Sequence, residues 1–389
     1  MNYHLKTTAV RLPQSVIGSV PQVALHGPGP SDVHPRVLEA LSQKTIGHLD
    51  PWFIHTMDEI STMLRLAMGT QNRLTYPVSS TGSAGMQTIL DNTLEPGDLA
   101  IIGVNGYFGN RMCDMAERCG ATVVRVEAPW GQIIPPEKLI EAHRAYPEAK
   151  VLAVVHAETS TGAWQPLADL GTYLSSTPTL FLVDGVTSLG GVPVELDVWH
   201  VDAFYSGTQK CLGAPTSLSP VSFSPKAVDA IQRRKHKVQS WCFDASLIMQ
   251  YWKNDGSPQR AYHHTAPINT LFGLHEALRL LLEEGLENVW ARHVGVSQKL
   301  RTGLQGMGFG LLTDPNHQLP QLTPVSMPGA LPETPLRQRL RQEHLIEVGG
   351  GMGEWAGKAW RIGLMGPMGA QENRVDNLLE AIRSVLAKP

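Results

Sequence analysis

Two residues of this chain, Asp184 and Lys210, have types and positions that suit one particular reaction. Asp184 ends the apolar run 179–184, and Lys210 comes shortly after the next apolar run, 202–206. A lysine amine can form a Schiff base with a carbonyl compound, and a carboxylate can keep a pyridine nitrogen protonated. Pyridoxal phosphate chemistry requires both groups, so the pair predicts an enzyme that uses this cofactor.

The elements that must position these side chains are short apolar runs. They alternate with helical patterns such as 137–146, and they occupy residues 99–104, 122–126, 151–156, 179–184, 202–206 and 220–223. Continuous apolar runs of this length are typical of buried parallel strands joined by crossover helices. The pattern predicts an α/β domain in which Asp184 ends one strand and Lys210 follows the next.

A second chemical signal lies upstream, where residues 74–79 predict a strand and residues 81–90 predict a helix that begins with small residues. The first backbone N–H groups of a helix have no partners inside the helix, and they can hold an anion. We therefore expect this turn to bind a phosphate group.

The pattern changes after residue 265. Long helices are expected at 268–284 and 288–307, weaker strands near 321–327 and 360–364, and a last helix at 371–386. These features predict three parts: an N-terminal arm (1–23), a large domain (24–280) and a small C-terminal α+β domain (281–389).

Composition argues against several other classes of protein. The chain has 389 residues, 42% of them hydrophobic, and its net charge of -3 gives no basic field for nucleic acid. The basic run 233–237 is interpreted as a solvated helix end. No window approaches the ~18 apolar residues of a membrane helix, and the N-terminus has no apolar signal core. The four cysteines lack zinc-site spacing, so we expect reduced thiols, no metal site and a cytoplasmic location.

Two segments are the most specific motifs of the chain, VDGVTSLGG at 183–191 and YSGTQK at 205–210, and further blocks lie in the same order at 27–31, 94–98, 157–162, 262–265 and 360–364. Together they resemble the class V aminotransferases, nearest to their alanine-glyoxylate and serine-pyruvate members. The resemblance implies the type I fold of pyridoxal phosphate-dependent transferases, with a large, mostly parallel sheet domain. It also implies a homodimer with active sites at the subunit interface.

The resemblance implies a role for each matching residue. Lys210 would form the Schiff base and move the substrate proton, Asp184 would pair with the pyridinium nitrogen, and Phe108 would stack on the ring. The other implied cofactor contacts are Thr81, Gly82, Ser83 and Gln209 at the phosphate, Thr159 near the phenolic oxygen, Val186 beside the ring, and Tyr262 and Thr265 reaching the phosphate from the neighbouring subunit.

Two residues are implied to bind the substrate, Arg361 and Gly29. A guanidinium suits the α-carboxylate of an amino acid because two parallel charge-assisted hydrogen bonds fix its orientation. Each assignment also has an ordinary structural interpretation: Phe108 as a core side chain, Thr159 as part of a local turn, and Tyr262 and Thr265 as core residues of one subunit.

The implied reaction is ping-pong transamination from a small L-amino acid, alanine or serine, to glyoxylate or pyruvate. Aspartate- or 2-aminoethylphosphonate-using transaminases and a non-catalytic protein of the same fold remain alternatives. A cysteine desulfurase is disfavoured because no cysteine follows Cys242. Residues 351–356 fit GxGxxA, but they lie too near the C-terminus to open a dinucleotide-binding unit.

The sequence departs from the family pattern at two places. Ser80 stands where glycine is expected, and Thr216 and Ser217 stand where Pro-Gly is expected. The additional side chains are expected to reshape the loops around the cofactor.

Overall fold

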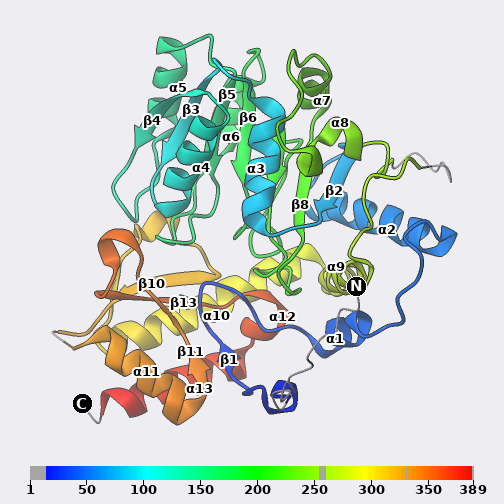
Figure 1. The fold of residues 1–389 in the computed structure, drawn as a ribbon. Coiled ribbons are helices and arrows are strands. Elements are labelled where there is room, and N and C mark those ends of the chain that lie inside the picture. The colour runs from blue at the N-terminus through cyan, green and yellow to red at the C-terminus, as the bar shows by residue number, and fades with distance from the viewer. Residues whose placement is uncertain (1–14, 254–259, 330, 388–389) are drawn as a thin grey trace, which may run out of the picture.

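The computed structural model describes residues 15–253, 260–329 and 331–387, so most of the predicted arm lies outside the described residues. The chain forms two bodies, one around a seven-stranded sheet and one around a four-stranded sheet. The seven-stranded sheet occupies the upper half of Figure 1, and the C-terminal body lies below it.

The large sheet is mostly parallel, as predicted. In spatial order its strands are β2 (Leu74–Val78), β8 (Ser219–Phe223), β7 (Ala203–Tyr205), β6 (Leu180–Asp184), β5 (Val151–Val155), β3 (Leu99–Val104) and β4 (Thr122–Glu127). Only β8 runs antiparallel to its neighbours. The other strands all point the same way, so their carboxyl ends meet at one edge of the sheet.

Helices cover both faces of this sheet. The helices α3 (Gly82–Thr93) and α4 (Tyr107–Arg118) pack together on the face toward the viewer in Figure 1, whereas α5 (Pro136–Ala145) and α6 (Ala168–Leu174) pack together on the other. Right-handed crossovers produce this division, because the chain reverses its direction across the sheet after β4. With both faces covered, β5 and β6 are buried along their whole length.

Helices α1 (Pro35–Leu41), α2 (Pro51–Ala67) and α9 (Ile268–Glu284) pack together beside the β2 end of the sheet. The helices α7 (Pro225–Gln232) and α8 (Ala245–Ile248) are shorter. Among the described residues, no helix combines the length and apolar character needed to cross a membrane.

The C-terminal body has its own hydrophobic core around Trp360. Its antiparallel sheet consists of β12 (Gly349–Gly350), β13 (Ala359–Gly363), β10 (Leu322–Ser326) and β9 (Gly310–Leu311), and its helices are α10 (Leu286–Gly306), α11 (Glu333–His344), α12 (Gly366–Gly369) and α13 (Glu372–Leu386). The short strand β1 (Ala24–Leu25) pairs with β11 (Ile346–Glu347) of this body. The domain boundaries at 23 and 280 stay a prediction.

The chain crosses between the two bodies directly after β1. We call residues 26–31 the bridging segment. At its start the backbone N–H of Gly363 donates to the carbonyl oxygen of His26 at 2.8 Å, and at its end the N–H of Ser31 donates to the carbonyl oxygen of Gln209 at 2.9 Å. A Cβ on Gly363 would lie 1.9 Å from the carbonyl oxygen of Gly27, so only glycine permits this close backbone approach. The bridging segment therefore ties the small sheet to the loop that carries Lys210.

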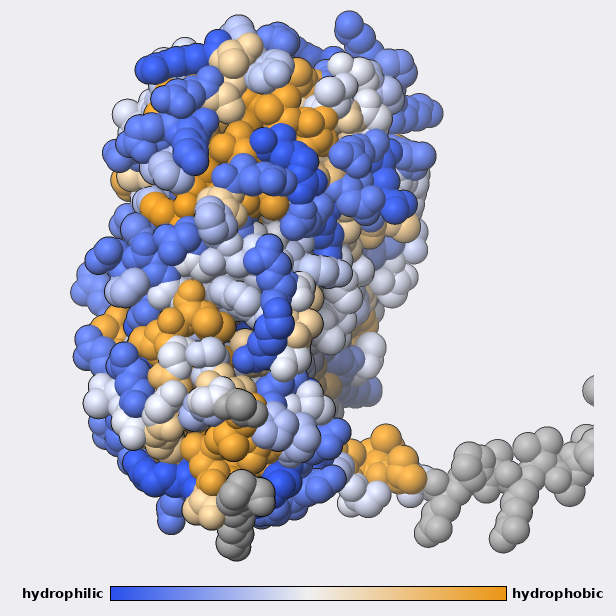
Figure 2. Space-filling model, turned by 90° about the vertical axis from the view of Figure 1, so that its left-hand side faces the viewer, coloured by the Kyte–Doolittle hydropathy of each residue, from blue (hydrophilic) through white to orange (hydrophobic). Residues whose placement is uncertain are grey.

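Strand β4 forms an edge of the large sheet, at the left of Figure 1. Figure 2 views the molecule from that side and shows hydrophobic surface in its upper half, interrupted by hydrophilic side chains. On β4 itself the half-buried Val123, Val124 and Val126 alternate with an ion pair between Arg125 and Glu127 (3.0 Å). Charged side chains on an edge strand oppose pairing with another chain.

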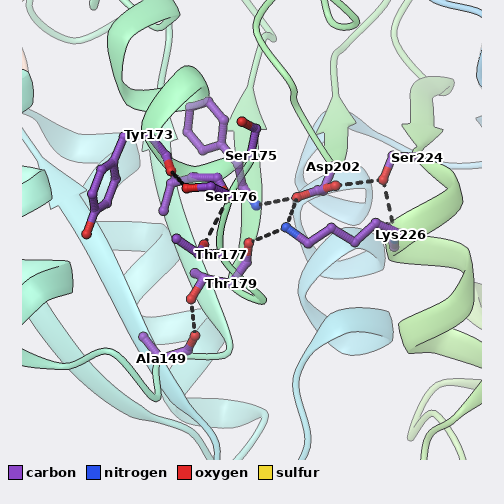
Figure 3. Close-up of polar contacts among 12 residues, drawn as sticks. Ala149, Tyr173, Ser175, Ser176, Thr177, Thr179, Asp202, Ser224 and Lys226 are labelled. Carbon is purple, nitrogen blue, oxygen red and sulfur yellow. Dashed lines mark hydrogen bonds and ion pairs between the residues drawn. The ribbon is translucent and has the colours of Figure 1, made fainter.

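At the end of the sheet opposite these carboxyl ends, Asp202 joins three elements (Figure 3). Its buried carboxylate accepts hydrogen bonds from the backbone N–H of Phe181 (3.0 Å), from Ser224 Oγ (2.7 Å) and from Lys226 Nζ (3.1 Å). These bonds fix the start of β6 and the end of the antiparallel strand β8 relative to β7. The carboxylate of Asp202 thus stabilises the strand arrangement at the end of the sheet opposite to Asp184.

Replacing Asp202 by Ala should lower the free energy of unfolding by about 2 kcal/mol, because the N–H of Phe181 is left unpaired in a buried position and the links to Ser224 and Lys226 are lost. Urea denaturation followed by circular dichroism measures this change. Asp229→Asn is the matched control, since Asp229 pairs with Arg233 on the exposed surface and should have no measurable effect. An unchanged midpoint for the Asp202 variant would contradict the stabilising role.

Candidate active site

The carboxyl ends of the parallel strands place the predicted site residues along one edge of the sheet. These residues follow β2 (Thr81, Gly82 and Ser83), β3 (Phe108), β5 (Thr159), β6 (Asp184 at its end, then Val186) and β7 (Gln209 and Lys210). Ligand sites of α/β sheets lie at this edge because the loops that leave the strands open outward there.

Lys210 is buried, with 8% of its surface exposed, and its amine donates to the carbonyl oxygen of Pro28. Burial, assisted by the positive charge of Arg361, lowers the pKa of Lys210 to about 8. Gly29 lies directly against it: a Cβ at Gly29 would be 2.6 Å from Lys210 Cδ, and the φ of +102° also favours glycine. The bridging segment therefore supplies one wall around the amine.

Asp184 is 2% exposed, and its carboxylate accepts two hydrogen bonds. The backbone N–H of Val186 donates to one oxygen at 2.8 Å, and the hydroxyl of Tyr205 donates to the other. Burial raises the pKa of Asp184, and these two bonds oppose that rise. A positive charge beside the carboxylate would favour its ionised form, as a pyridinium ring does.

The contact of Tyr205 with Asp184 was not predicted, although Tyr205 lies within the YSGTQK motif. It is the last residue of β7, and its side chain is fully buried. The parallel register places Tyr205 directly beside Asp184, so the pairing of β6 with β7 was the signal that could have indicated the contact.

The predicted phosphate turn starts α3, with Thr81 at the N-cap. Thr81 and Ser83 are exposed and Gly82 is buried. Among the described residues, the N–H groups of Gly82 and Ser83 have no acceptor, and the side-chain oxygen of Gln209 is buried without a hydrogen-bond partner. Free N–H donors at a helix start fit an anionic group. Gln209 could contribute to such a site only through its side-chain NH2 group, because its oxygen is an acceptor.

Phe108 is half-buried in the first turn of α4, and Glu158 fixes the position of that turn. The carboxylate of Glu158 accepts from the N–H of Phe108 (3.1 Å) and of Gly109 (3.3 Å), and also from the N–H (3.0 Å) and hydroxyl (2.6 Å) of Ser160. Burial raises the pKa of Glu158. No role was predicted for Glu158, although it follows a predicted strand in the same way as the other site residues.

Arg361 comes from β13 of the C-terminal body and reaches the same edge. It is 8% exposed, and its guanidinium donates to the carbonyl oxygens of Gly350 (2.8 Å) and Thr159 (3.1 Å). Burial lowers the pKa of Arg361 to about 10, which leaves it charged at neutral pH. Within the described ranges no carboxylate lies at ion-pair distance, so this cation is available to an anionic ligand.

Thr159 is buried, and its hydroxyl is hydrogen-bonded to the hydroxyl of Thr187. Thr187 follows Asp184 closely in the chain. Thr159 therefore contacts both sides of the site: its hydroxyl contacts the loop after β6, and its carbonyl oxygen accepts from Arg361.

Tyr262 and Thr265 lie on the outside of the chain. Tyr262 is 60% exposed, and its contacts are with Thr265 (3.4 Å between hydroxyls) and the ring of His48 (5.2 Å). Neighbouring His264 bonds to Ser79, close to the phosphate turn. In the described part of this chain, neither Tyr262 nor Thr265 forms a hydrogen bond with Lys210 or the phosphate turn.

The loop that departs from the family pattern has a backbone conformation that favours glycine at one of its two unusual positions. Ser217 has a φ of +117°, which favours glycine. Thr208 Oγ1 donates to the carbonyl oxygen of Pro215 in the same loop (2.6 Å). The side chains at 216 and 217 therefore do not prevent the turn from forming.

The described residues contain no group of three or more side chains suited to hold a metal ion. They do fit pyridoxal phosphate: a buried amine of lowered pKa, a buried carboxylate, and a helix start with free donors lie at one edge of the sheet.

The Aminotransferase class-V family model matches residues 25–352. The chain therefore belongs to the class V aminotransferases, as the motifs predicted. It is an aminotransferase with the type I fold, and its cofactor is pyridoxal phosphate.

Individual relatives narrow the comparison. The chain is 40% identical to the alanine–glyoxylate aminotransferase of Oryctolagus cuniculus, over 94% of this chain and 93% of the relative. It is 37% identical to the (S)-ureidoglycine–glyoxylate transaminase of Bacillus subtilis, over 93% and 90%. A crystal structure of alanine–glyoxylate aminotransferase from Nostoc sp. is 46% identical, with a TM-score of 0.91 and coverage of 96% of this chain and 100% of that chain.

Replacing Gly29 by Ala should displace Lys210 and reduce turnover by at least about tenfold, because the new methyl group would overlap its side chain. Gly97→Ala is a matched control: Gly97 also has a positive φ (+91°), but a Cβ there meets nothing within 4 Å. Steady-state kinetics and cofactor absorbance of both variants measure the difference. Equal losses in the two variants would show that backbone strain alone explains the effect.

The lowered pKa of Lys210 predicts a pH-dependent stability of the cofactor-free protein. The folded pKa of about 8 lies below the ordinary value of 10.5, so between these values the unfolded chain binds more protons and stability rises with pH. Below pH 8 the folded protein bears the cost of a buried charge. Cofactor-free Lys210→Met should therefore melt at a higher temperature than cofactor-free wild type at pH 7, with a smaller difference at pH 10.

Thermal denaturation at both pH values measures this difference, and Lys44→Met, at an exposed lysine, is the control that should show no such change. A stability difference that is equal at pH 7 and pH 10 would contradict the assignment.

Proposed function

We propose that this aminotransferase moves the amino group of a small L-amino acid, alanine or serine, to glyoxylate or pyruvate by a ping-pong mechanism. The observation that carries the proposal is the buried, unneutralised guanidinium of Arg361 at the same edge as Lys210. Arg361 would bind the α-carboxylate common to the amino acid and the keto acid.

Pyridoxal phosphate, when bound, supplies an aldehyde that reacts with amines and a pyridinium ring that withdraws electrons from the substrate Cα. The residues of the chain do the rest. Lys210 has a pKa of about 8, so its amine is neutral above that pH. The neutral amine would accept the proton from the substrate Cα and return a proton in the reverse half-reaction. Asp184 would keep the ring nitrogen of the cofactor protonated, and Phe108 would lie against the ring. Arg361 orients the substrate so that its Cα–H bond faces the lysine.

A small donor is favoured by the crowding at Lys210. The carbonyl oxygen of Pro28 accepts from the lysine amine, and a Cβ at Gly29 would overlap the lysine side chain, so the bridging segment closes one side of the space next to Lys210. The names of two relatives support glyoxylate as the acceptor. One is an alanine–glyoxylate aminotransferase and the other an (S)-ureidoglycine–glyoxylate transaminase.

Two alternatives predict different chemistry. A 2-aminoethylphosphonate substrate has no α-carboxylate, so it would leave Arg361 without a carboxylate partner. Aspartate carries a second carboxylate and would need a second cation to bind it, which alanine and serine do not. A non-catalytic protein of this fold is excluded by membership of the aminotransferase family together with the presence of Lys210 and Asp184.

We also infer a homodimer with shared active sites. Tyr262 and Thr265 are exposed on one chain and are connected through His264 to Ser79, next to the phosphate turn. Their exposure leaves both side chains accessible to a second subunit, as the family resemblance implies. In such a dimer both residues would contact the phosphate group bound by the partner.

A cytoplasmic location stays a prediction. It is supported by the cysteines at 113, 119, 211 and 242, which are all free thiols.

A half-reaction titration tests the proposed substrates. L-alanine or L-serine should bleach the yellow protein in the absence of any keto acid, and glyoxylate or pyruvate should restore the colour.

In Arg361→Leu the KM for the donor should rise by about tenfold to a hundredfold, because the carboxylate loses a charge-assisted pair. Lys210→Ala should show no turnover while its circular dichroism stays that of the wild type.

Bleaching by L-aspartate, 2-aminoethylphosphonate or (S)-ureidoglycine with no response to alanine or serine would overturn the proposed donor. An Arg361→Leu variant with an unchanged KM would overturn the assigned role of Arg361, but not the reaction itself.

A further inference from the structure

The residues proposed to hold the cofactor phosphate carry no positive charge. They are the neutral side chains and backbone groups of Thr81, Gly82, Ser83 and Gln209. A phosphate ester carries a charge of about −1.5 to −2 at neutral pH. Neutral donors and a helix dipole compensate only part of this charge, so a nearby cation would strengthen the binding of the phosphate.

Arg111 is the cation that the fold brings to this place. It projects from the second turn of α4, and its Nη1 donates to Ser83 Oγ at 3.0 Å. Its guanidinium also lies 4.8 Å from the centroid of the Phe108 ring and 5.2 Å from that of Tyr107. The two aromatic rings hold the guanidinium beside the start of α3 through cation–π contacts.

The electrostatic surroundings of Arg111 leave its charge available. Within the described ranges, no carboxylate lies at ion-pair distance from the guanidinium, and Ser83 is its one hydrogen-bonded partner. Its field also reaches the buried end of the site: burial raises the pKa of Tyr205, and the charge of Arg111 opposes that rise. Arg111 thus contacts the phosphate turn through Ser83, and its charge also acts on Tyr205.

We propose that Arg111 binds the phosphate group of pyridoxal phosphate and supplies the positive charge that the phosphate turn lacks. The guanidinium is held at the side chain of Ser83, where a phosphate on the N–H groups of Gly82 and Ser83 would meet it. A planar guanidinium can donate two parallel hydrogen bonds to a phosphate, in addition to its charge. This inference rests on the proposed phosphate turn, and it does not depend on which amino donor the enzyme uses.

A purely structural role makes a different prediction. Since Arg111 contacts the ring of Phe108, it could instead act only by fixing the aromatic side chain over the cofactor ring. Loss of that function would weaken the binding of any pyridoxal compound, with or without a phosphate. Loss of a phosphate contact would weaken only the phosphorylated form.

The test compares pyridoxal 5'-phosphate with pyridoxal, which lacks the phosphate. Each is titrated into cofactor-free full-length protein, and binding is followed by visible absorbance. In Arg111→Gln the affinity for pyridoxal 5'-phosphate should fall by about tenfold or more, as expected for the loss of a charge-assisted hydrogen bond. The affinity for pyridoxal should stay within about twofold. Arg111→Lys, which keeps the charge, should fall between wild type and Arg111→Gln.

Arg118→Gln is the matched control. Arg118 lies on the same helix, but it is exposed and paired with Asp114, so its loss should change neither affinity. A second readout uses inorganic phosphate alone, which should raise the melting temperature of the cofactor-free wild type more than that of Arg111→Gln.

Equal weakening of both ligands in Arg111→Gln would overturn the proposal in favour of the structural role, and an unchanged affinity for pyridoxal 5'-phosphate would overturn it outright. If wild type itself bound the two compounds equally, the phosphate turn would be wrong as well. Should Arg111→Gln fail to fold, the same comparison of the two compounds in Arg111→Lys decides the question, because a phosphate contact predicts selective weakening there too.

Discussion

The candidate active site depends on buried ionisable side chains whose hydrogen bonds are made mainly to the backbone. Lys210 donates to the carbonyl oxygen of Pro28, Arg361 donates to two carbonyl oxygens, and Glu158 accepts from N–H groups at the start of α4. Burying a charge is costly unless it is hydrogen-bonded. Because backbone dipoles bear this cost in part, the charges of Lys210 and Arg361 are not neutralised by acidic side chains, and ligands of opposite charge can bind them.

This arrangement requires both bodies of the protein. The parallel sheet provides the cofactor residues because its strands end at one edge, and the C-terminal body provides Arg361. The bridging segment joins them: its Gly29 contacts Lys210, and its Gly27 lies against Gly363 of β13. A change in how the two bodies pack would therefore move Arg361, the proposed substrate-binding cation, relative to the lysine. Turn 158–160 is a second connection, because Glu158 holds the helix start that carries Phe108 while the carbonyl oxygen of Thr159 accepts from Arg361.

Much of the fold followed from local patterns. The apolar runs predicted the positions of the strands of the large sheet, because a strand covered on both faces is apolar along its whole length. The parallel direction expected for the run 220–223 was wrong, since β8 is antiparallel to both neighbours. The motifs around Asp184 and Lys210 predicted the family and the cofactor. The roles of Tyr205, Glu158 and Arg111 were not predicted, since each depends on a partner from another strand or helix. Ser83 and Arg111, for example, lie on different helices that meet only when α3 and α4 pack together.

The sequence by itself determined which chemistry the chain can perform, because residue type fixes what a side chain can donate, accept or bond: an amine for a carbonyl, a carboxylate for a ring nitrogen, a guanidinium for a carboxylate. The tertiary structure alone decided the reactivity of these groups. The pKa of Lys210 falls to about 8 because the folded chain removes water from the amine and places Arg361 near it. Neither burial nor distance between residues far apart in the chain is encoded locally, so both appear only when the two bodies pack together.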